Sequence, residues 1–291
     1  MEFLQQVING LALGSVYALL ALGYTMVYGI IQLINFAHGE IYMIGAFAGF
    51  YSASTLKLPL IPTLLVAMAA SALAGIIIEK IAYKPLRNSP RIALLITAIG
   101  ISLFLQNAMR LLVGSNPKPF PDLINAGSIN IGPVQIEVKT ILMFVVSALL
   151  VILLQFIVYK TKIGKAMRAS SQDMEAASLM GINVDNTISL TFAIGSALAG
   201  IAGVLVAISY PSITPYMGAM PGLKAFVAAV LGGIGSIPGA LVGGIAIGLL
   251  ETFSKAYIST NFSDAIVFAI LIVILLIKPS GLLGKKTNVK V

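Results

Sequence analysis

Long apolar stretches separated by short polar links run along the whole chain. They occupy about residues 7–31, 33–51, 60–83, 91–113, 139–160, 187–209, 224–251 and 262–278. Each is close to the roughly 20 residues that cross a bilayer as a helix. The apolar residues are continuous and do not alternate with polar ones, which excludes a membrane β-barrel. The pattern predicts an all-α polytopic membrane protein, a single transmembrane domain over 1–291 with about eight membrane-embedded helical segments.

Two of these runs contain residues that a straight apolar helix does not favour. The run at 33–51 carries polar and ionisable groups, and the run at 224–251 carries the sequence GGIGSIPG. Glycine and proline break helices, and broken helices at membrane depth are tolerated where they are buried in protein or line a wet cavity. We therefore expect at least one broken or re-entrant segment. The resulting candidates for a translocation pathway are Asn35, His38, Gly39, Glu40, Gly232, Gly233, Gly235, Ser236, Pro238 and Gly239.

Basic residues in the short links predict the orientation, because they favour the cytoplasmic side. The link at 84–90 and the segment that begins at Lys160 are rich in Lys and Arg, whereas the loop at 114–138 has few. The C-terminal tail is also basic, with Lys278, Lys285, Lys286 and Lys290. That tail reaches the cytoplasm only if 224–251 enters the membrane, breaks at its glycines and returns. The N-terminus then lies outside, or 33–51 is re-entrant as well.

Composition narrows the function classes further. Hydrophobic residues make up 58% and charged residues 10% of the chain, well below the roughly 25% charged residues of soluble domains. The net charge of +8 belongs to the basic links, so membrane lipid and not nucleic acid is the expected environment. With no cysteine, one histidine and scattered carboxylates, we expect no metal site, no cofactor site and no catalytic residues.

The longest polar segment in the middle of the chain, about 160–186, predicts a short cytoplasmic helix. Ser170-Ser171-Gln172-Asp173 has the spacing of a helix-start signature, and Gly181 is a natural C-terminal cap. A helix of about two turns over 173–180 would be tied to a membrane span at each end. Such a helix can receive a push from a soluble partner, although a plain polar loop fits the pattern too. The residues expected to serve this coupling are Asp173, Glu175, Ala176, Ala177 and Gly181.

Asn35, His38 and Glu40 allow two interpretations. Ionisable groups within a membrane mark a pathway or a structural pair. A structural role would have them bond the broken backbone of a neighbouring helix. A proton relay through His38 would need further acids at depth, and Glu79 and Glu251 lie near the ends of their runs.

Four stretches resemble one known family: LINFAHGEIYMIGAF (33–47), GKAMRASSQDMEAASLMGIN (164–183), LKAFVAAVLGGIGSIPGALVGG (223–244) and KPSGLLG (278–284). In this order and spacing they resemble the permease subunits of bacterial branched-chain amino-acid ABC importers, and most closely the H-type subunit of the leucine/isoleucine/valine system. Glu175-Ala176-Ala177 with Gly181 looks like the core of the permease "EAA…G" signature. The Leu-Pro that ends the fuller signature is absent, so the docking geometry need not be the same.

The resemblance implies a multi-pass permease of the bacterial inner membrane without ATPase activity of its own. Its implied partners are a second, M-type permease, two cytoplasmic ABC ATPases that bind the ATP, and a periplasmic or lipid-anchored solute-binding protein. The implied function is inward movement of a branched-chain amino acid such as leucine. Importers of urea and short-chain amides share much of the pattern. An ion-coupled secondary transporter with broken helices is the alternative from another class, and an enzyme is the weakest interpretation.

Overall fold

The computed structural model describes residues 2–87, 89–124, 127–131 and 134–284. Lys285, Lys286 and Lys290 of the basic tail therefore lie outside the described residues. The helices are α1 (Glu2–Ile31), α2 (His38–Ser54), α3 (Leu60–Ile78), α4 (Arg91–Val113), α5 (Val138–Lys160), α6 (Lys162–Gln172), α7 (Met174–Leu179), α8 (Val184–Ser209), α9 (Ala219–Gly232), α10 (Ile237–Tyr257) and α11 (Ser263–Ile277). A π-helical turn, η1 (Glu79–Tyr83), and a 3-10 turn, η2 (Lys84–Leu86), continue α3.

The predicted all-α membrane fold is confirmed. Within the described ranges, six helical stretches are long and apolar enough to cross a membrane: α1, α3 with its continuation to Leu86, α4, α5, α8 and α10. The rest of the predicted eight segments are shorter helices, namely α2 with 17 residues, α9 with 14 and α11 with 15. The prediction of about eight membrane-embedded segments, at least one of them broken, thus becomes six long spans and three shorter helices, because the broken run at 224–251 contains both α9 and α10.

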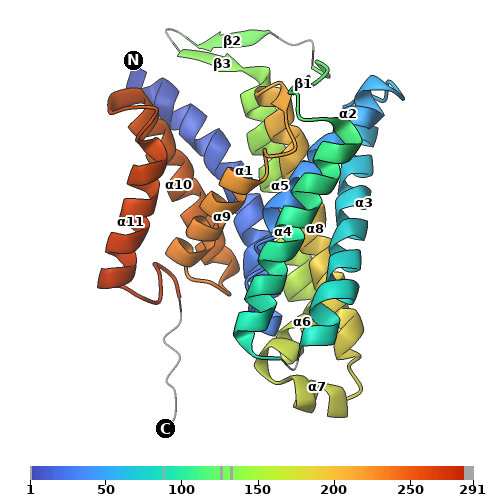
Figure 1. Cartoon of the computed structure of the whole chain (residues 1–291). Coiled ribbons are helices and arrows are strands. Elements are labelled where there is room, and N and C mark those ends of the chain that lie inside the picture. The colour runs from blue at the N-terminus through green and yellow to red at the C-terminus, as the bar shows by residue number, and fades with distance from the viewer. Residues whose placement is uncertain (1, 88, 125–126, 132–133, 285–291) are drawn as a thin grey trace.

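The broken run at 224–251 is a helical hairpin, as the parity of the basic links required. Figure 1 shows α9 running down from the end of the bundle that holds the N-terminus, and α10 returning to that end. Helix α11 then runs toward the opposite end, where α6 and α7 lie (Figure 1). Since the positive-inside rule makes the α6–α7 end cytoplasmic, the N-terminus lies outside. Small strands lie on the outer end: β1 (Lys118–Pro119) pairs with β4 (Ser212–Ile213), and β2 (Ser128–Ile131) with β3 (Val134–Glu137).

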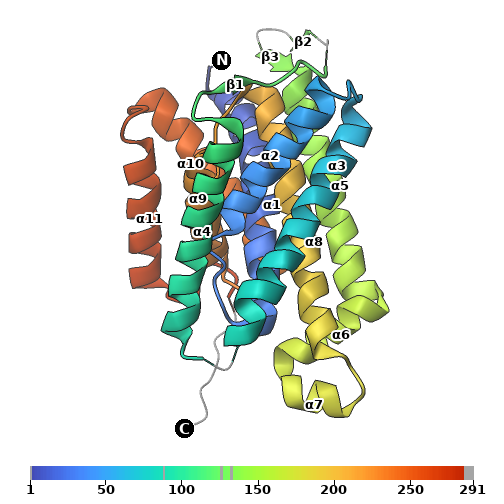
Figure 2. The same cartoon turned by 45° about the vertical axis from the view of Figure 1, so that its right-hand side comes forward.

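One arrangement of helices occurs twice, in opposite directions. The first set consists of a long helix (α1), a non-helical link, a half-helix (α2), a long helix (α3) and an outer helix (α4). The second set has the same order and consists of α8, a link, α9, α10 and α11. Figures 1 and 2 show α1 descending where α8 ascends, and α3 descending where α10 ascends. The two sets interlock, because α1 packs against α10 and α8 packs against α3. Helices α1 and α8 are almost wholly buried at the centre, whereas α4 is mostly exposed.

Glycine lets these central helices approach closely, because it has no side chain to separate the two backbones. A side chain at Gly14 would overlap the backbone of α10 at Ile245, and one at Gly248 would overlap Gly14. On the other side, Gly45 of α2 lies against Gly200 of α8. These glycines are therefore packing residues, and they fix the centre on which the polar sites are built.

Candidate functional site

The polar segment between α5 and α8 folds into two helices, and the short helix predicted over 173–180 is the second of them, α7. Ser170 and Ser171 belong to the last turn of α6, a helix that the sequence analysis did not predict. The N-cap of α7 is Asp173, whose Oδ1 accepts a hydrogen bond from the amide of Ala176 at 2.9 Å. Ser170 is thus wrong as the cap of this helix, because it lies within α6, whereas Asp173 has the extended backbone of an N-cap and accepts from an amide of the following turn.

The end of α7 was predicted correctly. Gly181 has φ +84°, a left-handed conformation that favours glycine. The amide of Gly181 donates a hydrogen bond to the carbonyl of Ser178 at 3.0 Å, and the amide of Ile182 donates to the carbonyl of Ala177 at 3.0 Å. This is the capping arrangement that satisfies the last carbonyl groups of a helix. Asn183 then caps α8 by accepting from the amide of Asn186 at 2.9 Å, so α7 joins its span without a flexible link.

Helix α7 presents its side chains to the solvent at the cytoplasmic end. Ala177 is the one α7 residue that is buried, while Asp173, Glu175 and Ala176 are exposed. Two large apolar side chains follow, Leu179 at 88% and Met180 at 83% exposure. Apolar residues this exposed on a rigid turn outside the membrane are typical of a protein interface.

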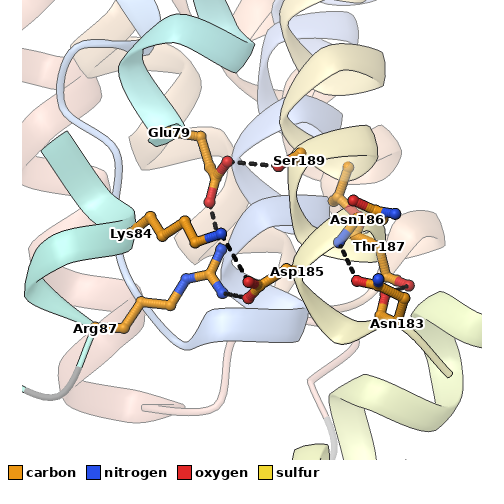
Figure 3. A network of polar contacts seen from close by, with 9 residues as sticks. Glu79, Lys84, Arg87, Asn183, Asp185, Asn186, Thr187 and Ser189 are labelled. Atoms are coloured by element: carbon orange, nitrogen blue, oxygen red, sulfur yellow. Dashed lines mark hydrogen bonds and ion pairs between the residues drawn. The ribbon is translucent and has the colours of Figure 1, made fainter. Parts of the chain in front are cut away.

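An ion network holds α3 against α8 just above this segment (Figure 3). Arg87 pairs with Glu79 of η1 and, at 2.5 Å, with Asp185 of α8. Lys84 pairs with the second oxygen of Asp185 at 2.8 Å, and Ser189 donates to Glu79 Oε2 at 2.6 Å. Glu79 is 0% exposed, whereas Lys84 and Asp185 are about half exposed, 50% and 49%. Arg87 is therefore the residue that compensates the buried charge.

The π-helical turn that carries Glu79 also contacts the start of α2. The hydroxyl of Tyr83 donates to Asn35 Oδ1 at 2.9 Å, and the same oxygen accepts from the amide of Ala37 at 3.1 Å. Asn35 thus bonds the broken backbone before α2, which is the structural alternative considered from the sequence. π-turns are frequent at functional sites, and this one connects the cytoplasmic network to the half-helix.

His38 is enclosed between α1 and α2. Its ring packs edge-on against Tyr24 with 4.8 Å between the centroids, and Gly23 provides the space that its Nε2 occupies. The Nε2 atom forms no hydrogen bond with any of the described residues. His38 therefore lies behind the start of α2 and does not line either of the two cavities described below.

Gly39 and Glu40, in contrast, line a cavity of ≈170 Å³, which we call the half-helix cavity. It lies where α2 and α9 begin, because Gly39 packs directly against Gly218 and Gly222. Glu40 is 1% exposed, and its Oε1 accepts from Ser102 at 3.1 Å and from Gln106 at 2.6 Å, both on α4. The full lining is Tyr24, Phe36, Gly39, Glu40, Ile99, Ser102, Leu103, Gly218, Ala219, Gly222 and Leu223.

The predicted glycine break forms the tip of the α9–α10 hairpin. Gly233 and Gly235 have φ +103° and +91°, Ser236 caps α10 by accepting from the amide of Gly239 at 3.2 Å, and Pro238 lies in its first turn. Gly232 and Gly239 face each other across the hairpin. Gly232 comes ten positions after Gly222 in α9, so the two residues are about 15 Å apart along the helix axis. The two predicted groups of pathway residues are therefore not brought together.

The segment after α11 covers this tip. The amides of Leu282 and Leu283 bond the carbonyls of Leu231 and Gly232 at 2.8 and 2.9 Å. These are carbonyls at the end of α9 that have no partner within their own helix. The sequence KPSGLLG at 278–284 is thus a backbone cap for the hairpin, and Gly233 packs against Gly284.

A buried charge cluster that the sequence analysis missed joins α9 to three other helices. Lys224 is 5% exposed and pairs with Glu251 of α10 at 2.8 Å and with Asp264 of α11 at 2.6 Å. Lys255 also pairs with Glu251 at 2.5 Å, and the hydroxyl of Tyr17 on α1 donates to Glu251 at 2.7 Å. A lone lysine inside an apolar run was the signal that could have identified this cluster.

A second and larger cavity, the outer cavity, opens at the end that holds the N-terminus. Its volume is ≈820 Å³, and its walls come from the outer ends of α1, α5, α8 and α10. The lining is mostly polar and includes Gln5, Gln6, Asn9, Gln135 and Thr252, with Glu2, Glu137 and Lys255 as charged groups. Lys255 connects this cavity to the charge cluster around Glu251.

Comparisons with known proteins agree over the whole chain. The family described as "Branched-chain amino acid transport system / permease component" matches residues 6–275. The high-affinity branched-chain amino acid transport system permease protein LivH of Salmonella typhimurium is 47% identical over 99% of this chain and 98% of its own length. LivH of Escherichia coli K12 is 46% identical over the same shares, and BraD of Pseudomonas aeruginosa is 44% identical over 100% and 98%.

Solved structures share the fold at low sequence identity. PsaBC from Streptococcus pneumoniae, solved in complex with Fab, superposes with a TM-score of 0.52 at 16% identity, over 96% of this chain and 93% of that one. This likeness concerns the fold alone.

Proposed function

Because this chain belongs to the family of branched-chain amino-acid transport permease components, we propose that it is the membrane-spanning permease subunit of an ATP-driven importer for branched-chain amino acids. The observation that carries the proposal is the match to this family along the entire chain. The family and the apolar helices make it a multi-pass permease of the bacterial inner membrane. It acts in transport and does not itself hydrolyse ATP, which its partner ATPases bind.

We assign the contact with one of two cytoplasmic ABC ATPases to α7. The support is a rigid helix, capped at both ends, that exposes Leu179 and Met180 on the cytoplasmic side. A groove between ATPase lobes would take these two side chains, and closure of the ATPases would move α7 as a rigid body. Asn183 and Asp185 would pass this movement to α8, and Arg87 would pass it to α3.

The outer end would receive the amino acid from a solute-binding protein, and a second, M-type permease would complete the pathway. The outer cavity supports this entry point, because it is large, polar and open on the side opposite α7. The half-helix cavity with Gly39 and Glu40 is the proposed interior part of the pathway. The hairpin tip from Gly232 to Gly239 is proposed to move with it.

A reconstituted complex tests this function. Proteoliposomes with the chain, its M-type partner and both ATPases should take up labelled leucine, isoleucine or valine when ATP and the loaded binding protein are present. Labelled urea is the comparison that separates the amino-acid function from an amide importer. The purified chain alone, given only an ion gradient, should transport nothing; uptake under that condition would establish a secondary transporter instead.

Variants of α7 test the coupling. Leu179→Ser combined with Met180→Ser should lose co-purification of the ATPases, and Gly181→Pro should abolish uptake while the chain still inserts into the membrane. Ile163→Ser on α6 is the matched control, since it also removes an exposed apolar side chain near the cytoplasmic end. Normal uptake by Gly181→Pro, or equal loss of the ATPases with Ile163→Ser, would remove α7 from the coupling role.

A further inference from the structure

The half-helix cavity combines an unsatisfied buried acceptor with apolar walls. Three carboxylates are buried among the described residues: Glu40, Glu79 and Glu251. Glu79 pairs with Arg87, and Glu251 pairs with two lysines. Glu40 has no Lys or Arg partner in the described part of the chain, and its Oε2 accepts no hydrogen bond there. A buried carboxylate oxygen without a partner is costly unless a ligand supplies one.

The position of Glu40 explains how its carboxylate is held in place. It lies in the first turn of α2, at the end where the helix dipole is partially positive. Ser102 and Gln106 hold Oε1 from the other wall. Oε2 is therefore the carboxylate oxygen that has no partner among the described residues, in a side chain that belongs to the cavity lining.

The remaining walls are largely hydrocarbon. Ile99 and Leu103 come from α4, Phe36 from the link before α2, and Ala219 and Leu223 from α9. The volume of ≈170 Å³ equals about five or six water molecules at roughly 30 Å³ each. This space suits a small molecule with one cationic or donor group beside a compact aliphatic body.

We infer that Glu40 Oε2 receives the α-ammonium group of the amino acid in the half-helix cavity, with the aliphatic side chain against Ile99, Leu103 and Leu223. This inference rests on the proposed function and adds the residue and the substrate group that meet. The starts of α2 and α9 meet at the same cavity, since Gly39 packs against Gly218 and Gly222 and all three line it. Half-helix starts of this kind attract carboxylate groups, so both charged groups of a zwitterion find a counterpart.

The first test compares Glu40→Gln with the native chain in the full reconstituted complex. Glutamine keeps the size and one acceptor oxygen for Ser102 and Gln106, but removes the negative charge. A charge-assisted hydrogen bond contributes about 1.5–3 kcal/mol, so leucine uptake per ATP hydrolysed should fall about 10- to 150-fold. Stimulation of the ATPases by the binding protein should remain. Asn107→Ala on α4 is the control: it removes an exposed amide that donates to the carbonyl of Leu103, and it should transport normally.

The second test uses the absence of cysteine from this chain. Glu40→Cys and, separately, Leu103→Cys are treated with an aminoethyl methanethiosulfonate reagent, and modification of this chain is read by peptide mass spectrometry. Leucine delivered by the binding protein should slow the labelling of both positions at least tenfold, and a urea addition should not. The Leu103→Cys variant keeps Glu40, so it gives an answer even where changes at Glu40 prevent assembly.

The outcomes separate this inference from the proposed function. Uptake by Glu40→Gln within twofold of the native chain, or labelling of Leu103→Cys that leucine does not slow, overturns the role of Glu40 while leucine transport by the native complex stands. Failure of the native complex to transport leucine overturns the proposed function itself.

Discussion

Arg87 offers the sharpest test of how the cytoplasmic ends of α3 and α8 are held together. Its guanidinium bridges Glu79, which is buried, and Asp185, which is half exposed. Arg87→Met removes both pairs but keeps a side chain of similar length. Glu79 is then left in the protein interior, where Ser189 is its remaining hydrogen-bond donor among the described residues.

The expected magnitudes differ strongly between the two basic residues of this network. Removing one partner of a buried ion pair costs about 3–5 kcal/mol, because the other charge stays buried without compensation. Lys84→Met breaks the half-exposed pair with Asp185, which contributes about 0.2–1 kcal/mol. Glu79→Gln combined with Arg87→Met removes both buried charges and should recover most of the loss.

The measurement is the midpoint of thermal unfolding in detergent, followed by circular dichroism because the chain has no tryptophan. At about 2–4 °C per kcal/mol, Arg87→Met should lower the midpoint by the order of 10 °C, and Lys84→Met by a few degrees at most. Leucine uptake by the complex should fall more with Arg87→Met than with Lys84→Met. Equal effects of the two substitutions, or a double variant less stable than Arg87→Met, would refute the assignment of Glu79 as a buried charge compensated by Arg87.

Two further predictions concern the hairpin. Gly233→Ala should destabilise the tip and uncover the end of α9, because the residue has φ +103° and an added Cβ would meet the backbone of Gly284. The measurement is the rate at which a protease cleaves the C-terminal segment, which should be faster in Gly233→Ala than in the control Gly127→Ala, in an outer loop. Lys224→Met should lower the unfolding midpoint more than Lys255→Met, because Lys224 is buried and neutralises both Glu251 and Asp264. Equal midpoints for the two lysine variants would show that the cluster carries no buried charge.

Local signals in the sequence were sufficient for several elements. Asp173 and Gly181 bound α7 because a cap depends on only a few neighbouring residues. The hairpin break followed from its glycines and from the parity of the basic links. Ser170 was wrong as the cap of α7, because it has the composition of a cap but lies in the helical last turn of α6.

The roles of the polar residues at membrane depth could not be obtained in this way. Asn35, His38 and Glu40 lie within six residues of one another, yet Asn35 bonds Tyr83, His38 packs against Tyr24 and Glu40 faces a cavity. Their partners come from α1, η1 and α4, and a helix that breaks before α2 turns neighbouring residues toward different helices. Likewise, Lys224 meets Glu251 and Asp264 only because α9, α10 and α11 pack together.

The order of apolar runs and basic links by itself determined the class of protein and the side on which α7 lies, because these depend on the free energy of placing each residue in lipid or water. The tertiary structure alone decided which buried charges are compensated and which one is not. That distinction depends on contacts between helices far apart in the chain, such as Arg87 with Asp185 or Glu40 with Gln106. Hydrophobic periodicity carries no information about such pairs, since ion pairing acts over a few ångströms in space and not along the sequence.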